Sequence, residues 1–491
     1  MEHQVDLYYL IGFAAITGIA ILVARLLSRP RNSDRVMNTG PAHHDTVPVA
    51  PQDSRIIQRD HHSISRKDIT PSALKVLYRL QEAGFDAYIV GGGVRDLLLN
   101  LHPKDFDVAT NASPEEVHRL FRNSRMIGRR FKIVHVQFGR EIIEVATFRA
   151  HHAEQEEQGS DHSRQAANGM LLRDNVYGTL EEDVERRDFT INALYYTTKD
   201  FCIYDYHGGI SDLNNRVVRI IGEPEARYRE DPVRMLRAVR FAGKLGFDIE
   251  PVTAAPIHQL APLLAAVSNA RLFDEVLKLL SSGHGLPTWK LMWQYGLIAP
   301  MLPDTWQSLQ GDDEQTVQNR MMIELALANT DKRIAEGRPV TPAFLYAVLL
   351  WAPLLEELSY LQDEERMPLI PAMHEAAQRI MDRQVKHIAI PRRISSIMRE
   401  IWELQFRLPR RQGKRPDQLM EHPRFRASYD FLRLREESGE DLNGLGIWWE
   451  RYQEQTDDSR RSMIQDLKEN YSEPPRSKRR RRPRKRTPSN E

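Results

Sequence analysis

Residues 88–110 read YIVGGGVRDLLLNLHPKDFDVAT, and this stretch decides how the first globular part of the chain is interpreted. A β-like triplet runs into three glycines, and an apolar run that suits a helix follows them. Further along, Asp105 and Asp107 stand on either side of Phe106. If these three residues belong to a strand, both carboxylates face one side and Phe106 faces the other. The stretch therefore predicts a strand, a glycine turn and a helix beside a strand that displays two acids.

Two carboxylates in so small a volume repel each other, and a cation is needed to keep both ionised. A pair of Mg²⁺ ions suits this task, because Mg²⁺ prefers oxygen ligands and keeps positions open for water or phosphate. Ions held by Asp105 and Asp107 would activate an attacking hydroxyl and stabilise a leaving oxygen. Because an Asp-x-Asp motif alone is common in loops, the metal interpretation depends on the neighbouring motifs.

The glycine turn is the first of these motifs. A strand, a turn and a helix start expose backbone N–H groups, which favours a phosphate group near the three glycines. Arg95 lies on the first turn of the expected helix and would add a bidentate phosphate contact. A plain tight turn is the alternative. The stretch has no Gly-Lys-Ser/Thr and no G-x-G-x-x-G, so it is neither a Walker loop nor a dinucleotide fingerprint.

A third carboxylate is expected close to the pair, and the sequence offers two candidates. Glu144 alternates with apolar residues in EIIEVATF, residues 141–148, and would line the same cleft. Asp188 follows Arg186 and Arg187 in RRDFTINAL. Its alternative role is the N-cap of a helix formed by the residues after it. The residues alone leave these two roles of Asp188 evenly weighted.

The stretch YREDPVRMLRAVRF, residues 228–241, predicts a helix that starts at Asp231 and the proline after it. Arg234, Arg237 and Arg240 recur at every third position and would spread over one side of this helix, opposite buried valines and a leucine. They would neutralise a triphosphate, while Asp231 and Arg234 would read a base edge, one as acceptor and the other as donor. A solvated basic stripe is the alternative.

The 491 residues exceed one ordinary core, so two or more domains are expected. Strand-like runs at 86–90, 105–110, 133–138 and 141–148 alternate with helical segments, and helical periodicity dominates after residue 223. This pattern predicts an α+β fold: a mixed-sheet head, an all-α body and a disordered tail. The expected divisions are a hydrophobic segment 1–27, a linker 28–62, a head 63–222 with a mobile loop at 151–169, a helical neck 223–285, a helical body 286–470 and a tail 471–491.

Residues 7–24 contain no charged side chain, and basic residues follow them. Eighteen apolar residues are about the minimum to span a bilayer, and the charge bias would keep the rest of the chain in the cytoplasm. A start codon at Met37 is the alternative. Both interpretations predict a cytoplasmic enzyme, with a tether to the inner face of the membrane in the first.

The basic tail and the cysteine content narrow the function classes. Residues 476–486 carry nine lysines and arginines without an acid, which predicts an unfolded segment that attracts nucleic acid. A solubilising tail is the alternative. The single cysteine, Cys202, excludes an intrachain disulfide and a thiolate metal cluster, and it fits a reducing cytoplasm. The net charge of +1 decides nothing further.

Together, these motifs resemble the class II nucleotidyltransferases, which are the CCA-adding enzymes and the bacterial poly(A) polymerases. The resemblance rests on VGGGVRDLLL, PKDFDVAT, EIIEVATFR, EEDVERRDFTINALYY and REDPVRMLRAVRF, in this order. Residues 126–139, MIGRRFKIVHVQFG, resemble the poly(A) polymerase branch, as do WELQFRLPRRQGKR, LMEHPRFRASYDFLRLR and the basic tail. The resemblance covers the chain from about residue 64 to its end and leaves out the hydrophobic N-terminal segment.

This resemblance implies template-independent transfer of AMP from ATP to RNA 3′ ends, which marks RNAs for decay, and contact with the RNA-degradation machinery. It implies that Asp105 and Asp107 hold two Mg²⁺ ions, with Mn²⁺ as a substitute, that Asp188 is a third catalytic acid and that Glu144 supports the pair. The nucleotide-binding positions it implies are Gly92, Arg95, Arg187, Asp231, Arg234, Arg237 and Arg240.

Three other functions are weighed at this point. CCA addition to tRNA uses the same catalytic residues and is separated from polyadenylation only by residues 126–139 and the tail. A non-catalytic RNA-binding protein would gain nothing from exposed acids that face RNA phosphates. A membrane-tethered protein whose role is localisation would add to catalysis and not replace it.

Overall fold

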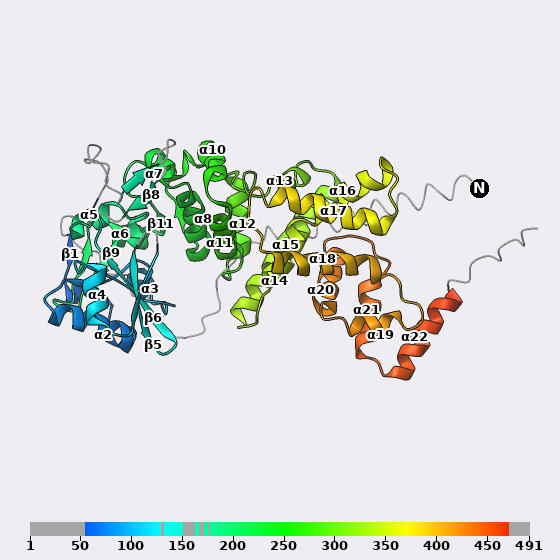
Figure 1. Cartoon of the computed structure of the whole chain (residues 1–491), viewed down its shortest axis with the longest axis horizontal. Helices are drawn as coiled ribbons and strands as arrows, with labels where there is room; N and C mark the ends of the chain where they lie inside the picture. The colour runs from blue at the N-terminus through cyan, green and yellow to red at the C-terminus, as the bar shows by residue number, and fades with distance from the viewer. Residues whose placement is uncertain (1–54, 129–131, 151–162, 166–170, 175–176, 471–491) are drawn as a thin grey trace, which may run out of the picture. The chain divides into compact units, whose positions relative to one another are not determined.

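The computed structural model describes residues 55–128, 132–150, 163–165, 171–174 and 177–470 (Figure 1). All of them belong to one compact unit, Val47–Glu491. The hydrophobic segment predicted at 1–27 and the basic tail 471–491 lie outside the described residues, as does most of the linker predicted at 28–62.

A mixed β-sheet forms the centre of the head, which confirms the α+β class. Its strand order is β1-β10-β9-β2-β3-β6-β5-β4, and β3 pairs with β6 in parallel while the other neighbours pair antiparallel. All four predicted strand runs are present. The strands are β1 (Ile56–Ile57), β2 (Ala87–Val90), β3 (Asp107–Thr110), β4 (Ser124–Ile127), β5 (Ile133–Phe138), β6 (Glu141–Thr147), β9 (Leu194–Tyr196) and β10 (Ile203–Asp205).

The two faces of this sheet have different surroundings. On one face, Val108, Val134 and Ile143 are buried in a core cluster that includes residues of α2 (Pro71–Glu82) and α4 (Pro114–Leu120). On the other face, Tyr88 and Val90 of β2 belong to a second, smaller cluster with residues of β9. The sheet therefore has helices on one face and, over β2 and β9, an aromatic cluster on the other.

Local signals place the helices that hold the sheet. Thr70 caps α2 by accepting the Ala73 N–H at 3.3 Å, and a proline occupies the first turn, as the sequence predicts. Ser113 caps α4 in a capping box with Glu116. The glycine turn leads directly from β2 into α3 (Gly92–Leu98), the helix predicted after it.

Three details of the head differ from the predictions. The linker was predicted to run to residue 62, yet β1 pairs with β10 and is followed by a short 3-10 helix, Arg59–His61. Strand β7 (Ser163–Gln165) lies inside the predicted loop 151–169 and pairs with β8 (Leu171–Asp174). The segment after Asp188 forms a 3-10 turn, Thr190–Asn192, and then β9, because its apolar residues enter the sheet. The predicted helix there is wrong. The remaining head elements are a 3-10 turn (Arg66–Asp68), α5 (Leu180–Glu185), α6 (Gly209–Asn215) and β11 (Val217–Val218), which pairs in parallel with β12 (Asp248–Ile249).

The rest of the described chain is helical apart from β12, as predicted after residue 223. Its helices are α7 (Pro224–Glu230), α8 (Val233–Leu245), α9 (Pro251–Ala254), α10 (Ile257–Leu260), a 3-10 helix (Ala261–Ala266), α11 (Asn269–Leu280), α12 (Gly285–Gln294), α13 (Pro303–Ser308), α14 (Glu314–Ala335), α15 (Pro342–Leu349), α16 (Trp351–Asp363), α17 (Leu369–Gln384), α18 (Arg392–Arg407), α19 (Arg415–Met420), α20 (Phe425–Glu437), α21 (Leu445–Glu454) and α22 (Asp457–Asn470).

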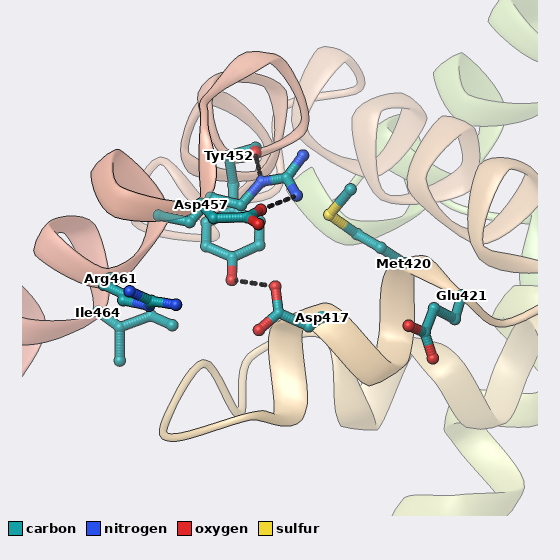
Figure 2. A pocket seen from close by; sticks show the side chains of 8 residues that line it. Asp417, Met420, Glu421, Tyr452, Asp457, Arg461 and Ile464 are labelled. Atoms are coloured by element: carbon teal, nitrogen blue, oxygen red, sulfur yellow. Dashed lines mark hydrogen bonds and ion pairs between the residues drawn. The ribbon is translucent and has the colours of Figure 1, made fainter.

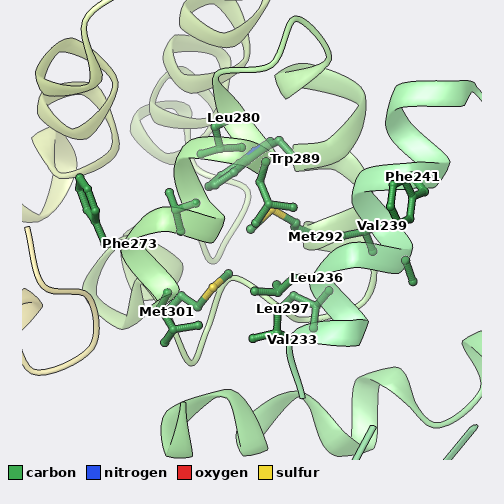
Figure 3. Packing of buried hydrophobic residues seen from close by; sticks show 14 of the residues in the cluster. Val233, Leu236, Val239, Phe241, Phe273, Leu280, Trp289, Met292, Leu297 and Met301 are labelled. Carbon is green, nitrogen blue, oxygen red and sulfur yellow. The ribbon is translucent and has the colours of Figure 1, made fainter. Parts of the chain in front are cut away.

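Helix α8 is amphipathic in the way its sequence predicts. Val233, Leu236 and Val239 are fully buried and lie among the side chains of α11 and α12, including Trp289 and Met292 (Figure 3). The predicted start at Asp231 is displaced, because Pro232 takes the N-cap position and Asp231 is the C-cap of α7. This packing fixes one side of α8 and turns the arginine side away from the core.

Among the described residues, no single helix has both the length and the apolar composition to cross a bilayer. Helices α15 and α16 satisfy both conditions only when taken as a pair, which is bent by 51°.

Candidate active site

The two acids of the opening stretch stand at the start of β3. Asp107 is the first residue of this strand, and Asp105 lies just before it. Phe106 is 3% exposed and packs into the core, while Asp105 and Asp107 are solvent-exposed. The alternation therefore turns both carboxylates out of the core, as the sequence predicts.

Asp107 carries an unfavourable negative charge. Neighbouring protein desolvates its carboxylate, although the residue is exposed, and this raises its pKa to about 6, with Glu144 and Asp105 adding repulsion. Arg187 and His135 act in the opposite direction but do not cancel the effect. Crowded oxygen donors of this kind fit a divalent cation, because the cation removes the repulsion. No group of three or more acidic, histidine or cysteine ligands is preassembled among the described residues.

Glu144 is placed beside the pair by the sheet itself. It lies directly opposite Asp107 in the parallel β3–β6 pairing. On its other side, His135 of β5 is opposite Glu144, and the two side chains meet with His135 Nε2 3.1 Å from Glu144 Oε1. The supporting role predicted for Glu144 thus has a geometric basis, and His135 is a neighbour that the sequence analysis missed.

Asp188 has different surroundings. Its carboxylate accepts hydrogen bonds from Arg237 Nε at 2.6 Å, from the Phe189 backbone N–H at 2.8 Å and from Asn192 Nδ2 at 3.3 Å. Burial alone would raise the pKa of Asp188, but Arg237 and these hydrogen bonds lower it below its usual value. In this structure Asp188 joins the head to α8 through Arg237. Its catalytic role stays a prediction.

The glycine turn lies next to the acids. Val90, the last residue of β2, is directly opposite Asp107 in the sheet, and the turn follows it. Gly91 has φ +66°, a backbone conformation that L side chains rarely adopt. A Cβ on Gly93 would lie 3.2 Å from Phe106, so the turn packs directly against the residue between the two acids. Gly92 begins α3 there.

Three arginines surround one aromatic ring near the turn. The guanidinium groups of Arg95, Arg237 and Arg240 lie 5.2, 5.3 and 4.8 Å from the ring centre of Phe241. Arg240 Nε is buried and has no hydrogen-bond partner, and burial together with Arg237 lowers the pKa of Arg240. Unpaired buried donors beside other cations are suited to bind an anionic group.

Arg95 is fixed more tightly than the sequence analysis assumed. It is 3% exposed, donates two hydrogen bonds to Asp96 Oδ1 at 2.8 and 2.6 Å, and donates a third to Asn192 Oδ1 at 2.6 Å. A Cβ on Gly92 would lie 3.4 Å from Arg95 Nη2. Arg95 therefore links α3 to the turn before β9, and its position beside the glycine turn is as predicted.

Arg187 lies on the other side of the glycine turn, where a Cβ on Gly91 would be 3.6 Å from Arg187 Nη1. It pairs with Asp183 at 3.1 Å and hydrogen-bonds to the Tyr195 hydroxyl. These partners raise its pKa against the effect of burial, so its charge is retained. Arg187 is thus a permanent cation close to Asp107.

The two residues predicted to read a base edge are engaged within the protein. The Asp231 carboxylate accepts hydrogen bonds from Nη1 and Nη2 of Arg271, at 2.9 and 2.7 Å. Arg234 bonds to Glu230 and to the Arg227 carbonyl, and both bonds use Nη1. The structure therefore places the pair at the start of α8, with the remaining nitrogens of Arg234 as donors.

Sequence reasoning missed the residues that hold these groups in place. Arg227 is buried and donates to the backbone carbonyls of Arg186 and Arg187, both at 2.7 Å. Burial and Arg234 lower the pKa of Arg227 to about 10. Asn192 and Arg271 also hold site residues, Arg95 and Asp231, and these partners lie far away in the sequence. In the sequence, the one signal for such a role is that Arg227 is a charged residue within a helical run.

Two cavities lie elsewhere. One of about 450 Å³ is bordered by α19, α21 and α22, where the Tyr452 hydroxyl donates to Asp417 at 2.8 Å (Figure 2). Another, of about 660 Å³, is lined by α14, α15, α18 and α20. Neither contains a predicted site residue. The geometry of the carboxylates and arginines, and not cavity size, locates the candidate active site.

Three family models match the chain. They are the poly A polymerase head domain at residues 87–219, the probable RNA and SrmB-binding site of polymerase A at 246–309, and the polymerase A arginine-rich C-terminus at 365–486. The first of these spans the acids and the glycine turn, and the third includes the basic stretch.

Individual proteins also match the chain. Poly(A) polymerase I of Escherichia coli is 50% identical over 447 residues, which are 90% of this chain and 94% of that protein. The CCA-adding enzyme of Lactobacillus helveticus is 42% identical over 212 residues, 43% of this chain and 50% of that protein. The crystal structure of the Bacillus stearothermophilus CCA-adding enzyme in complex with CTP has 27% identity and a TM-score of 0.52, and covers 81% of this chain and 84% of that one. The chain thus belongs to the bacterial poly(A) polymerase I family and is a polynucleotide adenylyltransferase with a nucleotidyltransferase fold.

Proposed function

We propose that this chain polyadenylates RNA with Asp105 and Asp107 as the metal-binding catalytic pair. The observation that carries the proposal is the crowded carboxylate group at the start of β3, which lies directly beside the glycine turn. Two Mg²⁺ ions, or Mn²⁺ in their place, would supply a lowered pKa of the attacking hydroxyl and charge stabilisation on the departing pyrophosphate. Asp105 and Asp107 would hold them, with Glu144 close by.

The reaction is an in-line displacement at phosphorus. The RNA 3′-hydroxyl gives its proton to solvent and its oxygen forms a bond to the α-phosphorus of ATP, while the bond from that phosphorus to the α,β-bridging oxygen breaks and pyrophosphate leaves with that oxygen. Arg187 and the turn at Gly92 lie next to the acids and would hold the phosphates there. Arg95, Arg237 and Arg240 around Phe241 would bind the triphosphate, because their combined charge exceeds that of their two acidic partners, Asp96 and Asp188.

Adenine selection would depend on the start of α8. Asp231 has oxygens that accept and Arg234 has nitrogens that donate, which is the complement of a base edge with both kinds of group. The bidentate contact of Arg271 holds the Asp231 carboxylate in one orientation. We infer that this fixed orientation contributes to selecting ATP over CTP.

RNA would be bound largely through its phosphates by the helical body, and the stretch 476–486 would add affinity. Weak sequence preference and strong salt dependence follow from this mode of binding. We place the activity in the cytoplasm, where tailed RNA would enter decay and the RNA-degradation machinery would be a partner. A tether through residues 7–24 to the inner face of the membrane is part of this proposal.

The test is nucleotide incorporation on an RNA primer by the full chain and by Asp105→Ala and Asp107→Ala. We expect AMP addition by the unchanged protein and a loss of about a thousand-fold in each variant, because the metal-binding pair is broken. Full activity in either variant would remove that acid from the mechanism. A parallel incubation of tRNA lacking its 3′ end with CTP separates this function from CCA addition, which incorporates CMP.

A further inference from the structure

Half of one sheet face is uncovered by the described helices. Over β4, β5 and β6, the side chains Ile127 and Ile142 are 38% and 44% exposed, while the alternate residue Ile143 is fully buried. The buried residues face α2 and α4 in the main core. We call the uncovered surface the open face, and it consists of Arg125, Ile127, His135, Gln137, Ile142 and Glu144.

The open face begins at the catalytic pair. Residues directly opposite one another in neighbouring strands point to the same side of a sheet. Such a row runs without interruption from Arg125 to His135, Glu144, Asp107 and Val90. A ligand that lies on the open face therefore reaches the Asp107 carboxylate without crossing the sheet.

The chemistry of the reaction decides which ligand this is. Strand β2 and the glycine turn are on one side of β3, while β6, β5 and β4 are on the other. In an in-line displacement, the attacking oxygen approaches from the side opposite to the leaving pyrophosphate. If the glycine turn and the arginines hold the phosphates, the RNA 3′-hydroxyl arrives from the β6 side.

From this geometry we propose that the open face binds the 3′-terminal nucleotides of the RNA primer; this inference rests on the proposed function. Arg125 contacts a backbone phosphate, and Ile127 and Ile142 pack on ribose and base faces. Apolar contacts of this kind read no base edge, so they accept any sequence, as a template-independent enzyme requires. Glu144, the acid on this face, lies directly opposite Asp107 and is in contact with His135.

The first experiment reverses one charge. We expect Arg125→Glu in the full chain to raise the KM for RNA about ten-fold and to leave the KM for ATP unchanged, because a phosphate contact becomes a repulsion. The matched control is Arg119→Glu on α4, another exposed arginine beside the opposite face. A change in the KM for RNA without a change in the KM for ATP distinguishes a loss of primer binding from damage to the fold.

The second experiment removes the apolar contacts. The double variant Ile127→Ser and Ile142→Ser should raise the KM for RNA about five-fold, since two exposed methyl-rich contacts are lost. The matched control is Ile56→Ser, because Ile56 is 40% exposed at the opposite edge of the same sheet. If Arg125→Glu and the double variant each behaved like its control, the open face would be excluded as the RNA-binding surface.

A third measurement does not depend on variants. RNA with a photoreactive 4-thiouridine two nucleotides from its 3′ end should crosslink to peptides that contain β4 or β6. Crosslinks confined to the helical body, from a protein that adds AMP normally, would overturn this inference and leave the proposed function intact. Failure of the unchanged protein to add AMP would instead contradict the proposed function.

Discussion

Asp107 and Asp188 are both carboxylates that the sequence analysis predicts to be catalytic, but their surroundings are opposite. Asp107 stands among other acids, and its pKa is raised to about 6. Asp188 is held by Arg237 and two further donors, and its pKa is lowered. The negative charge around Asp107 is not balanced within the protein and calls for a cation, whereas the charge of Asp188 is already balanced by Arg237. A carboxylate with a stable partner holds the fold, and one without a partner is available for chemistry.

This contrast predicts a large effect on stability at one position only. Asp188→Asn leaves Arg237 largely buried without its counter-charge and should lower the free energy of unfolding by about 3 kcal/mol. Asp107→Asn removes a repelled charge and should not lower it in metal-free buffer. Urea denaturation of both variants measures the difference. Equal losses of stability would mean that Asp107 also has a structural partner.

An intermediate effect is expected at Arg240, whose buried Nε has no partner. Arg240→Met keeps the packing on Phe241 but removes the charge, and it should raise the KM for ATP about ten-fold, equivalent to about 1.4 kcal/mol. The free energy of unfolding should stay unchanged, because no hydrogen bond to Nε is lost. Arg229→Met is the control, since Arg229 is an exposed arginine paired with Glu225. A stability loss at Arg240 without a change in KM would assign it to the fold.

The sequence predicts the local features of the molecule well. Thr70 as a cap, the strand at 141–148 and the buried positions Val233 and Leu236 all follow from residues within one or two helical turns. The helix predicted after Asp188 fails because the apolar residues there fit either a helix or a strand, and pairing with β2 and β10 decides between them.

The candidate site divides in the same way. The alternation of Asp105, Phe106 and Asp107 is local and was visible in the sequence. That Asp188 pairs with Arg237, and that Asn192 holds Arg95, depends on contacts between residues 49 and 97 positions apart. A single sequence carries no signal for such contacts. The residues next to Asp188 in the chain therefore indicated a role for it, but nothing in the sequence indicated that Arg237 is its partner in the structure.

A pH dependence with opposite signs is expected at the two acids. The pKa of Asp107 is about 6 when folded and about 3.9 when unfolded, so the folded state binds the extra proton between these values. Its contribution to the free energy of unfolding therefore falls as pH rises from about 4 to about 6. Asp188 has a lowered folded pKa, so its contribution is present above the unfolded pKa and is lost as pH falls.

Comparing the unchanged protein with Asp107→Asn isolates the first contribution, because Asp188 is common to both. In EDTA, the stability difference between them should shift in favour of the variant as pH rises from 4.5 to 7. Added Mg²⁺ at pH 7 should reverse that shift by stabilising the unchanged protein more, since the cation binds the ionised acids of the folded state only. A difference that stays constant with pH and with Mg²⁺ would mean that Asp107 is neither repelled by its neighbours nor part of a metal site.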